Sequence, residues 1–450
     1  MRAPHVFIET FGCQMNEYDT ELVRSILKDK GYRFTDSAET ADVVLLNTCA
    51  IRENAHNKVY GHLGALKPLK EDKGLVIGVL GCMAQNLKKD LMEGDSLIDI
   101  LAGPDSYRSL PELLEKAAAG RKRMAVDLSE YETYADITPD RVEGVTAWIA
   151  VMRGCDNFCT FCVVPYTRGR ERSRGFDGVV REAEALAASG CKQITLLGQN
   201  VNSYRDGAHD FADLLLAVAD IRGIERVRFT SPHPKDFPEK LLEAVAGHPR
   251  ICKHIHLPLQ AGNDRILQLM DRTYTRTEYL ALVDRIRTRC PEITLTTDII
   301  AGFCSETDAE FADTEDLVKQ VEYHSAFIFK YSERKNTIAA RKYADDVPDD
   351  VKAARVTRLV ERQRAISLKK NLAMIGKPVK VLVECDGKRS SDQWMGRTDG
   401  NIVTVFPKRG LAHFREDEKV PDPLSSIKPG SLTPVRITDA TVTTLYGEAV

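Results

Sequence analysis

The chain has 450 residues, of which 43% are hydrophobic and 29% are charged, so two or three globular domains are expected. A run of about 18 apolar residues is absent, which argues against a membrane-spanning helix. The formal net charge of −3 gives no overall basic footprint, so any nucleic-acid binding must depend on local patches. The first residues do not resemble a signal peptide, and we expect a cytoplasmic protein. In such a chain, eleven cysteines indicate metal or redox chemistry rather than disulfides.

Residues 1–140 alternate strand and helix patterns. Short runs rich in β-branched residues predict strands at 6–11, 42–47 and 75–80, and a helical pattern covers 18–30. Such alternation is typical of an α/β domain with a doubly wound parallel sheet.

A cysteine follows each of these three strands, namely Cys13, Cys49 and Cys82. Because the carboxyl ends of parallel strands lie on one edge of a sheet, three thiolates would converge there. Ordinary buried cysteines at strand ends are the alternative, and periodicity alone does not separate the two interpretations. The repeated Gly-Cys or Thr-Cys at successive strand ends favours a shared site.

Residues 141–375 continue the alternation in six strand–helix units, which indicates a barrel or partial barrel. The predicted strands are 148–152, 193–197, 226–230, 254–257, 294–300 and 326–331, followed by one long basic helix over 350–373.

Residues 376–450 lose the helical periodicity, and short strands at 379–383, 402–406 and 435–438 predict a small β-barrel. Barrels of this kind often bind nucleic acid. Because Lys and Arg barely outnumber Asp and Glu here, a plain accessory barrel is the alternative.

Three cysteines, Cys155, Cys159 and Cys162, follow the first predicted barrel strand on one loop with the spacing C-x3-C-x2-C. Three thiolates can hold three irons of a 4Fe–4S cube and leave the fourth iron open to a substrate. A structural zinc site would want four protein ligands. The end of a barrel strand is also where barrel active sites lie.

This motif, with Phe161 before its last cysteine, resembles the signature of the radical S-adenosylmethionine (SAM) superfamily. The resemblance implies that the open iron binds SAM and that cleavage of SAM gives a 5′-deoxyadenosyl radical. Contacts to SAM are expected near the ends of the barrel strands, although each residue could instead be core or hydrogen-bonding scaffold. The expected contacts are Phe161, Gln199, Asn200, His256, Gln260 and Asp298.

Residues 11–16, 47–53 and 81–85 resemble the N-terminal domain of the methylthiotransferases. In that family the three N-terminal cysteines hold an auxiliary 4Fe–4S cluster, and a C-terminal barrel of the TRAM type follows the radical SAM barrel. Residues 162–169 and 197–202 look most like the MiaB branch, which acts on N(6)-isopentenyladenosine next to the tRNA anticodon.

The resemblance implies two 4Fe–4S clusters and SAM as cofactors, this tRNA as substrate, and a low-potential electron donor such as a flavodoxin. Carbon 2 of adenine bears an unactivated C–H bond that acid–base groups cannot usefully attack, so a catalytic acid or base is not expected. A methylthiotransferase acting on a ribosomal protein and a non-catalytic metal-binding RNA module are the rival hypotheses. The first rival predicts that the ribosomal protein, and not tRNA, gains the mass of the thioether. Iron and sulfide analysis separates the second rival from an iron–sulfur enzyme.

Four alternating arginines follow the cluster loop, at Arg168, Arg170, Arg172 and Arg174. A short charge run is by default a solvated face, but beside a radical site we predict that these arginines bind RNA phosphates.

Two turns depart from the family pattern. Cys304-Ser305 and Lys335-Asn336 each stand where Pro-Gly is usual. Asn tolerates left-handed backbone, so the second turn is expected to keep its geometry.

Overall fold

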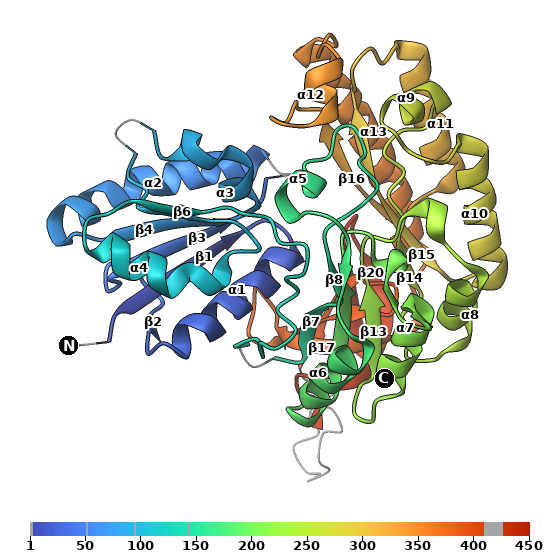
Figure 1. The fold of residues 1–450 in the computed structure, drawn as a ribbon. Helices are drawn as coiled ribbons and strands as arrows, with labels where there is room; N and C mark the ends of the chain where they lie inside the picture. Colours follow the sequence, from blue (N-terminus) through green and yellow to red (C-terminus); the bar gives the residue numbers. More distant parts are fainter. Residues whose placement is uncertain (1–2, 51–52, 94–95, 142–143, 409–425) are drawn as a thin grey trace.

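The computed structural model describes residues 3–50, 53–93, 96–141, 144–408 and 426–450. Its N-terminal unit is built on a six-stranded sheet in the order β2-β1-β3-β4-β5-β6, in which all neighbours are parallel (Figure 1). The strands are β1 (His5–Phe11), β2 (Arg33–Phe34), β3 (Val43–Thr48), β4 (Val76–Gly81), β5 (Ile100–Ala102) and β6 (Arg123–Ala125).

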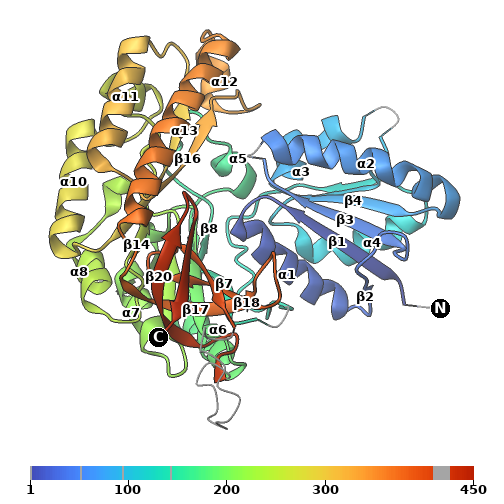
Figure 2. The same ribbon diagram turned by 180° about the vertical axis from the view of Figure 1, so that it is seen from behind.

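Helices cover both faces of this sheet, as Figures 1 and 2 show. One apolar core forms beneath α1 and α4, and a second beneath α2 and α3. The four helices are α1 (Gln14–Lys28), α2 (Glu53–Lys73), α3 (Cys82–Leu87) and α4 (Leu110–Ala118). The doubly wound parallel sheet is confirmed. The chain winds outward in opposite directions from β1, so the strand order reverses between β1 and β3, where ligands of such folds bind.

The central unit has six parallel strands in two three-stranded sheets, β7-β10-β13 and β14-β15-β16. An isolated parallel bridge pairs Val227 of β13 with Ile251, three residues before β14, at the junction of the two sheets. In the described part of the chain β7 and β16 do not pair with each other, so the unit is the expected partial barrel. The strands are β7 (Thr146–Ala150), β10 (Gln193–Leu197), β13 (Arg226–Phe229), β14 (His254–His256), β15 (Thr294–Ala301) and β16 (Ser325–Lys330).

Helices cover the outside of the partial barrel and enclose the largest apolar core of the molecule. They include α6 (Phe176–Ala188), α7 (Phe211–Asp220), α8 (Glu239–Gly247), α10 (Arg276–Arg289), α11 (Asp308–Val321) and α13 (Asp349–Leu372). Ala150 at the end of β7 and Leu197 at the end of β10 belong to the apolar core of the N-terminal unit, so the two units pack directly on one another.

The C-terminal unit is a closed five-stranded barrel in the order β17-β18-β19-β21-β20. Its strands are β17 (Pro378–Asp386), β18 (Gln393–Thr398), β19 (Val403–Pro407), β20 (Leu432–Ala440) and β21 (Thr444–Ala449). Two buried arginines of β13 attach it to the amino-terminal end of the partial barrel. Arg226 donates to the carbonyls of Arg397 (2.5 Å) and Lys380 (2.8 Å), and Arg228 donates to those of Thr398 (2.7 Å) and Asp399 (2.8 Å).

The three units follow the expected order, while the boundaries at 140/141 and 375/376 remain predictions. Among the described residues, none of the helices combines the length and the apolar character needed to cross a bilayer.

Candidate iron–sulfur site

The first cysteine triad lies at the carboxyl ends of three neighbouring strands. Cys13 follows β1, Cys49 follows β3, and Cys82 follows β4 and begins α3. A hydrogen bond with Cys49 lowers the pKa of the Cys13 thiol to about 6, although partial burial of this thiol acts in the opposite direction. At Gly12 the backbone has φ +138°, and a Cβ there would lie 2.5 Å from Cβ of Cys49. Glycine is therefore required for the two strand ends to approach each other.

The second triad lies on one loop between β8 (Met152–Arg153) and α5 (Val164–Arg168). Within the loop the Cys162 amide donates to the Cys159 carbonyl at 2.9 Å. Gly154 has φ +81°, and a Cβ there would lie 1.9 Å from the Arg170 carbonyl oxygen. Burial raises the pKa of the Cys155 thiol to about 12, so a metal that binds it must displace a proton.

The ligand set of each triad fits an iron–sulfur cluster. Among the described residues, no three His, Cys, Asp or Glu side chains form a group that could hold one metal ion. A cube is a different case, because each thiolate binds its own iron. Cysteine thiolates are the usual protein ligands of 4Fe–4S clusters, and within each triad the thiols are close enough to shift one another's pKa.

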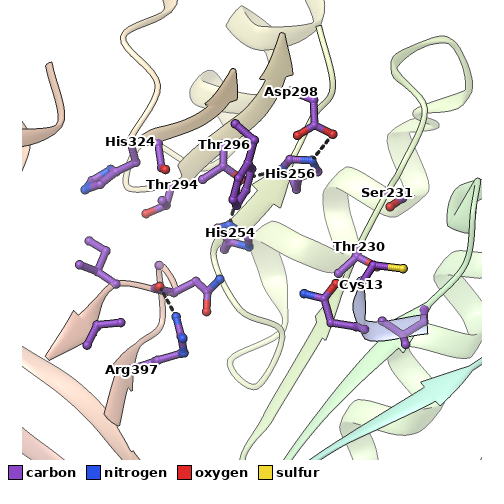
Figure 3. A pocket seen from close by; sticks show the side chains of 18 of the residues that line it. Cys13, Thr230, Ser231, His254, His256, Thr294, Thr296, Asp298, His324 and Arg397 are labelled. Carbon is purple, nitrogen blue, oxygen red and sulfur yellow. Dashed lines mark hydrogen bonds and ion pairs between the residues drawn. The ribbon is translucent and has the colours of Figure 1, made fainter. Parts of the chain in front are cut away.

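A cavity of about 540 Å³ connects the first triad with the interior of the partial barrel. Cys13 lines one end, and Arg397 of the C-terminal barrel lines the other (Figure 3). Cys49 is also among the lining residues. His256 and Asp298 lie between them. All three units of the chain therefore contribute walls to one cavity.

Three of the six expected SAM contacts line this cavity, namely Gln199, His256 and Asp298. Oε1 of Gln199 accepts a hydrogen bond from the Gly154 amide at 2.6 Å, so this side chain holds the cluster loop. His256 lies between Oγ1 of Thr296 (3.0 Å) and the Asp298 carboxylate (3.2 Å).

The other three expected contacts, Phe161, Asn200 and Gln260, are not among the residues that line the cavity. Phe161 packs against the barrel core. The buried Asn200 amide donates to Glu171 at 3.1 Å, and the Gln260 backbone amide donates to the Asp298 carbonyl at 2.9 Å. Contact of all six with SAM remains a prediction.

The structure does not support the predicted row of four phosphate-binding arginines, because three of them are buried in ion pairs. Arg168 pairs with Asp19 at 2.8 Å, Arg172 with Asp105 at 2.8 Å, and Arg174 with Glu182 at 2.7 Å. Their side chains are 3–5% exposed, so the prediction is wrong for these three. Asp19 and Asp105 are distant in sequence from the arginines they pair with, whereas Glu182 follows Arg174 by eight residues, and the charge run alone indicates none of these partners.

Arg170 is the exposed member of the row, with 68% of its side chain accessible. It forms an ion pair with Asp156 at 3.4 Å and lies 4.4 Å from the centre of the Phe158 ring. A contact between Arg170 and phosphate remains a prediction.

Several residues at the site carried no usable sequence signal. Asp19 is a single polar residue within a predicted helix. Arg272 donates to the Cys159 sulfur at 3.3 Å but lies in no recognisable sequence motif. Phe327 and Phe329 did carry a weak signal, because aromatic residues two apart in a predicted strand share a face. Both line the cavity.

The two unusual turns both contain left-handed backbone, with φ +59° at Ser305 and φ +74° at Asn336. The expectation for Asn336 is confirmed. Its side-chain amide also donates to the Asn86 carbonyl at 3.2 Å, on the helix that begins at Cys82. Of the N-terminal motif over 47–53, residues 51 and 52 lie outside the described residues.

The fold, the two triads and the shared cavity define the class of protein. Residues 149–318 match the radical SAM superfamily, residues 372–450 the TRAM domain, and residues 5–103 a family described as uncharacterized protein family UPF0004. The chain is a radical SAM protein with an additional cysteine-bearing N-terminal domain.

Relatives over nearly the full length identify the family. A tRNA-2-methylthio-N(6)-dimethylallyladenosine synthase of Chloroherpeton thalassium is 46% identical, over 99% of this chain and 96% of its own length. The synthase of the same name from Porphyromonas gingivalis is 45% identical over 99% and 95%. A CDK5RAP1-like protein of Caenorhabditis elegans is 44% identical over 98% and 84%. The chain belongs to the tRNA-2-methylthio-N(6)-dimethylallyladenosine synthase family.

A solved structure supports the fold alone. The radical S-adenosylmethionine methyltransferase TsrM from Kitasatospora setae, with cobalamin and a [4Fe-4S] cluster bound, has a TM-score of 0.58 at 15% identity. The match covers 75% of this chain and 77% of that one.

Proposed function

We infer that the protein is a radical SAM methylthiotransferase that converts N(6)-isopentenyladenosine next to the tRNA anticodon to its 2-methylthio derivative. It uses two molecules of SAM, a radical SAM 4Fe–4S cluster and an auxiliary 4Fe–4S cluster. The observation that carries this function is the shared cavity, in which Cys13 and Cys49 face the same space as Gln199, His256 and Asp298. A base bound there lies between the auxiliary triad and the barrel interior.

The cofactors supply the radical and the sulfur, and the protein holds the cofactors and the substrate in position. Cys155, Cys159 and Cys162 would hold the radical SAM cluster, and Cys13, Cys49 and Cys82 the auxiliary cluster. Gln199 fixes the loop of the first cluster through the Gly154 amide. Burial lowers the pKa of His254 well below its usual value, so this cavity histidine is neutral at pH 7.

The apolar wall of the cavity favours the isopentenyl group as the recognised feature. Phe327 and Phe329 lie on β16, yet 53% and 41% of their surfaces are exposed. Val164 and Ile402 also line the cavity. Large apolar side chains that face a cavity instead of packing are typical of a binding pocket for an apolar group. An unpaired anticodon-loop base can be turned into such a pocket, as RNA-modifying enzymes require.

The remaining partners are part of the same proposal. A low-potential electron donor such as a flavodoxin would reduce the radical SAM cluster, and the tRNA substrate favours a cytoplasmic location. Exposed Arg170, next to the cluster loop, is the member of the arginine row that remains available to a phosphate of the tRNA.

The test compares tRNA with and without the isopentenyl group, beside the ribosomal protein, with mass spectrometry of the products. We expect at least a tenfold preference for the isopentenylated tRNA, because an apolar pocket discriminates by roughly 10–200-fold for each methylene. Phe327→Ala and Phe329→Ala should reduce this preference, and Tyr131→Ala, which removes an exposed aromatic outside the cavity, should not. Equal activity on unmodified tRNA, or preference for the protein, would contradict the assignment.

A further inference from the structure

A buried charge network joins the two parts of the chain that carry the cysteine triads. The Asp19 carboxylate lies on α1, the helix that starts just after Cys13, and is fully buried. It accepts hydrogen bonds from Arg153 at 2.6 Å and from Arg168 at 2.8 Å. Both arginines belong to the radical SAM unit and flank its cysteine loop.

Arg168 extends through this network to the auxiliary triad. Its Nε donates to Sγ of Cys82 at 3.2 Å, while Nη2 binds Asp19. The two contacts use different nitrogens of one planar guanidinium group, so Asp19 fixes the direction in which Nε points. A side chain of the radical SAM unit is thereby fixed against a cysteine of the N-terminal unit.

The radical SAM triad has a matching contact of its own. Nη1 of Arg272 donates to Sγ of Cys159 at 3.3 Å. Arg168 and Arg272 are 3% and 8% exposed, so both positive charges act where water screens them little. Each triad therefore receives a buried guanidinium donor on one of its sulfur atoms.

We propose that Arg168 is a positioning residue for the auxiliary cluster. Its guanidinium group raises the reduction potential of that cluster and holds Cys82 against the radical SAM unit. The proposal rests on the proposed function, because it requires a cluster at Cys13, Cys49 and Cys82. Hydrogen bonds to cluster sulfurs and nearby charge are among the factors that set the potential. A buried positive charge favours the reduced cluster, which carries one more negative charge, and so raises the potential.

The test measures the midpoint potentials of both clusters in the full-length, reconstituted protein by electron paramagnetic resonance, without tRNA. Variants that lack one triad assign each signal. Arg168→Met should shift the auxiliary cluster toward its oxidised form by at least tenfold, a fall of about 59 mV for a one-electron couple, with the radical SAM cluster unchanged. Arg168→Lys keeps the charge and should give a smaller fall. Arg272→Lys is the matched control and should change the radical SAM cluster alone.

An unchanged auxiliary potential in Arg168→Met with full iron content would overturn the proposal, as would equal shifts at both clusters. If Arg168→Met fails to bind its second cluster, Arg168→Gln is measured instead, because it also removes the positive charge while its side-chain amide can still donate to Asp19. An unchanged potential in Arg168→Gln overturns the proposal equally. Failure of both neutral variants to bind the cluster also overturns it, because Arg168 would then be needed to form the site rather than to set its potential. A wild-type protein with about four irons would instead contradict the proposed function itself.

Discussion

The two cysteine triads use the same chemistry but are assembled in different ways. Cys155, Cys159 and Cys162 lie on one loop, so their spacing is set locally by a few residues and by Gly154. Cys13, Cys49 and Cys82 come from three strand ends and meet only because β1, β3 and β4 are neighbours in the sheet. Neighbouring strands lie about 4.8 Å apart, so the three ends lie within about 10 Å. The first site depends on a loop, and the second depends on a folded domain.

This difference also separates the expected roles. The loop triad lies beside the Gln199 contact that holds it to the barrel, whereas the strand-end triad opens into the cavity through Cys13 and Cys49. Radical generation should therefore survive changes in the N-terminal sheet, while product formation should not. The predictions below test this separation, in order of decreasing effect.

The largest effect is expected from replacing Cys155, Cys159 and Cys162 together by Ala. Reductive cleavage of SAM and product formation should both be lost, because the open iron that binds SAM is gone. Iron should fall from about eight to about four atoms per chain, since the auxiliary triad is intact. Iron analysis after anaerobic reconstitution measures this. Complete loss of iron would show that the two sites do not form independently.

The complementary change replaces Cys13, Cys49 and Cys82 together by Ala. The radical SAM cluster should still form and cleave SAM to 5′-deoxyadenosine, because its loop needs no residue of the N-terminal triad. Methylthiolated tRNA should be absent, because the sulfur source is gone. Chromatography of 5′-deoxyadenosine and mass spectrometry of tRNA nucleosides measure the two outcomes. Product formation by this variant would rule out the auxiliary cluster as the source of sulfur.

A smaller effect is expected at the interface between the two units. Asp19→Ala leaves Arg153 and Arg168 buried without their shared carboxylate and should lower the free energy of unfolding by about 3–5 kcal/mol. Asp156→Ala breaks the exposed ion pair with Arg170 and should cost less than about 1 kcal/mol. Urea unfolding compares the two variants. Equal destabilisation would mean that the buried network does not hold the units together.

Much of the fold could be predicted, because period and spacing are local properties. The strands that end at the N-terminal cysteines, the six barrel strands and the loop triad follow directly from such patterns. The short strands β2, β5 and β6 were not predicted, because a strand of two or three residues is too short to show a hydrophobic period. The arginine row was misinterpreted because charge in a sequence does not reveal its partner. Asp19 and Asp105 lie in another unit of the chain. The cavity wall from the C-terminal barrel was likewise beyond prediction.

The smallest effects are expected at the two turns that depart from the family pattern, and they should have opposite signs. Both positions have left-handed backbone, which costs an ordinary L-residue about 1–2 kcal/mol and costs glycine no steric strain. Ser305→Gly removes this strain but loses the exposed hydrogen bond that Arg265 donates to the Ser305 hydroxyl at 3.0 Å. A net gain in the free energy of unfolding of about 0.5 kcal/mol is expected.

Asn336→Gly gains less, because Asn tolerates this conformation, and it loses the hydrogen bond to the Asn86 carbonyl across the interface between the units. A net loss of about 0.5–1 kcal/mol is therefore expected. Urea unfolding of both variants and the wild type, in the same cluster-loaded state, measures the difference. Stabilisation by both changes would mean that the Asn336 side chain, like that of Ser305, does not stabilise the contact between the two units. Opposite signs would place Asn336 among the residues that hold the strand-end triad against the barrel.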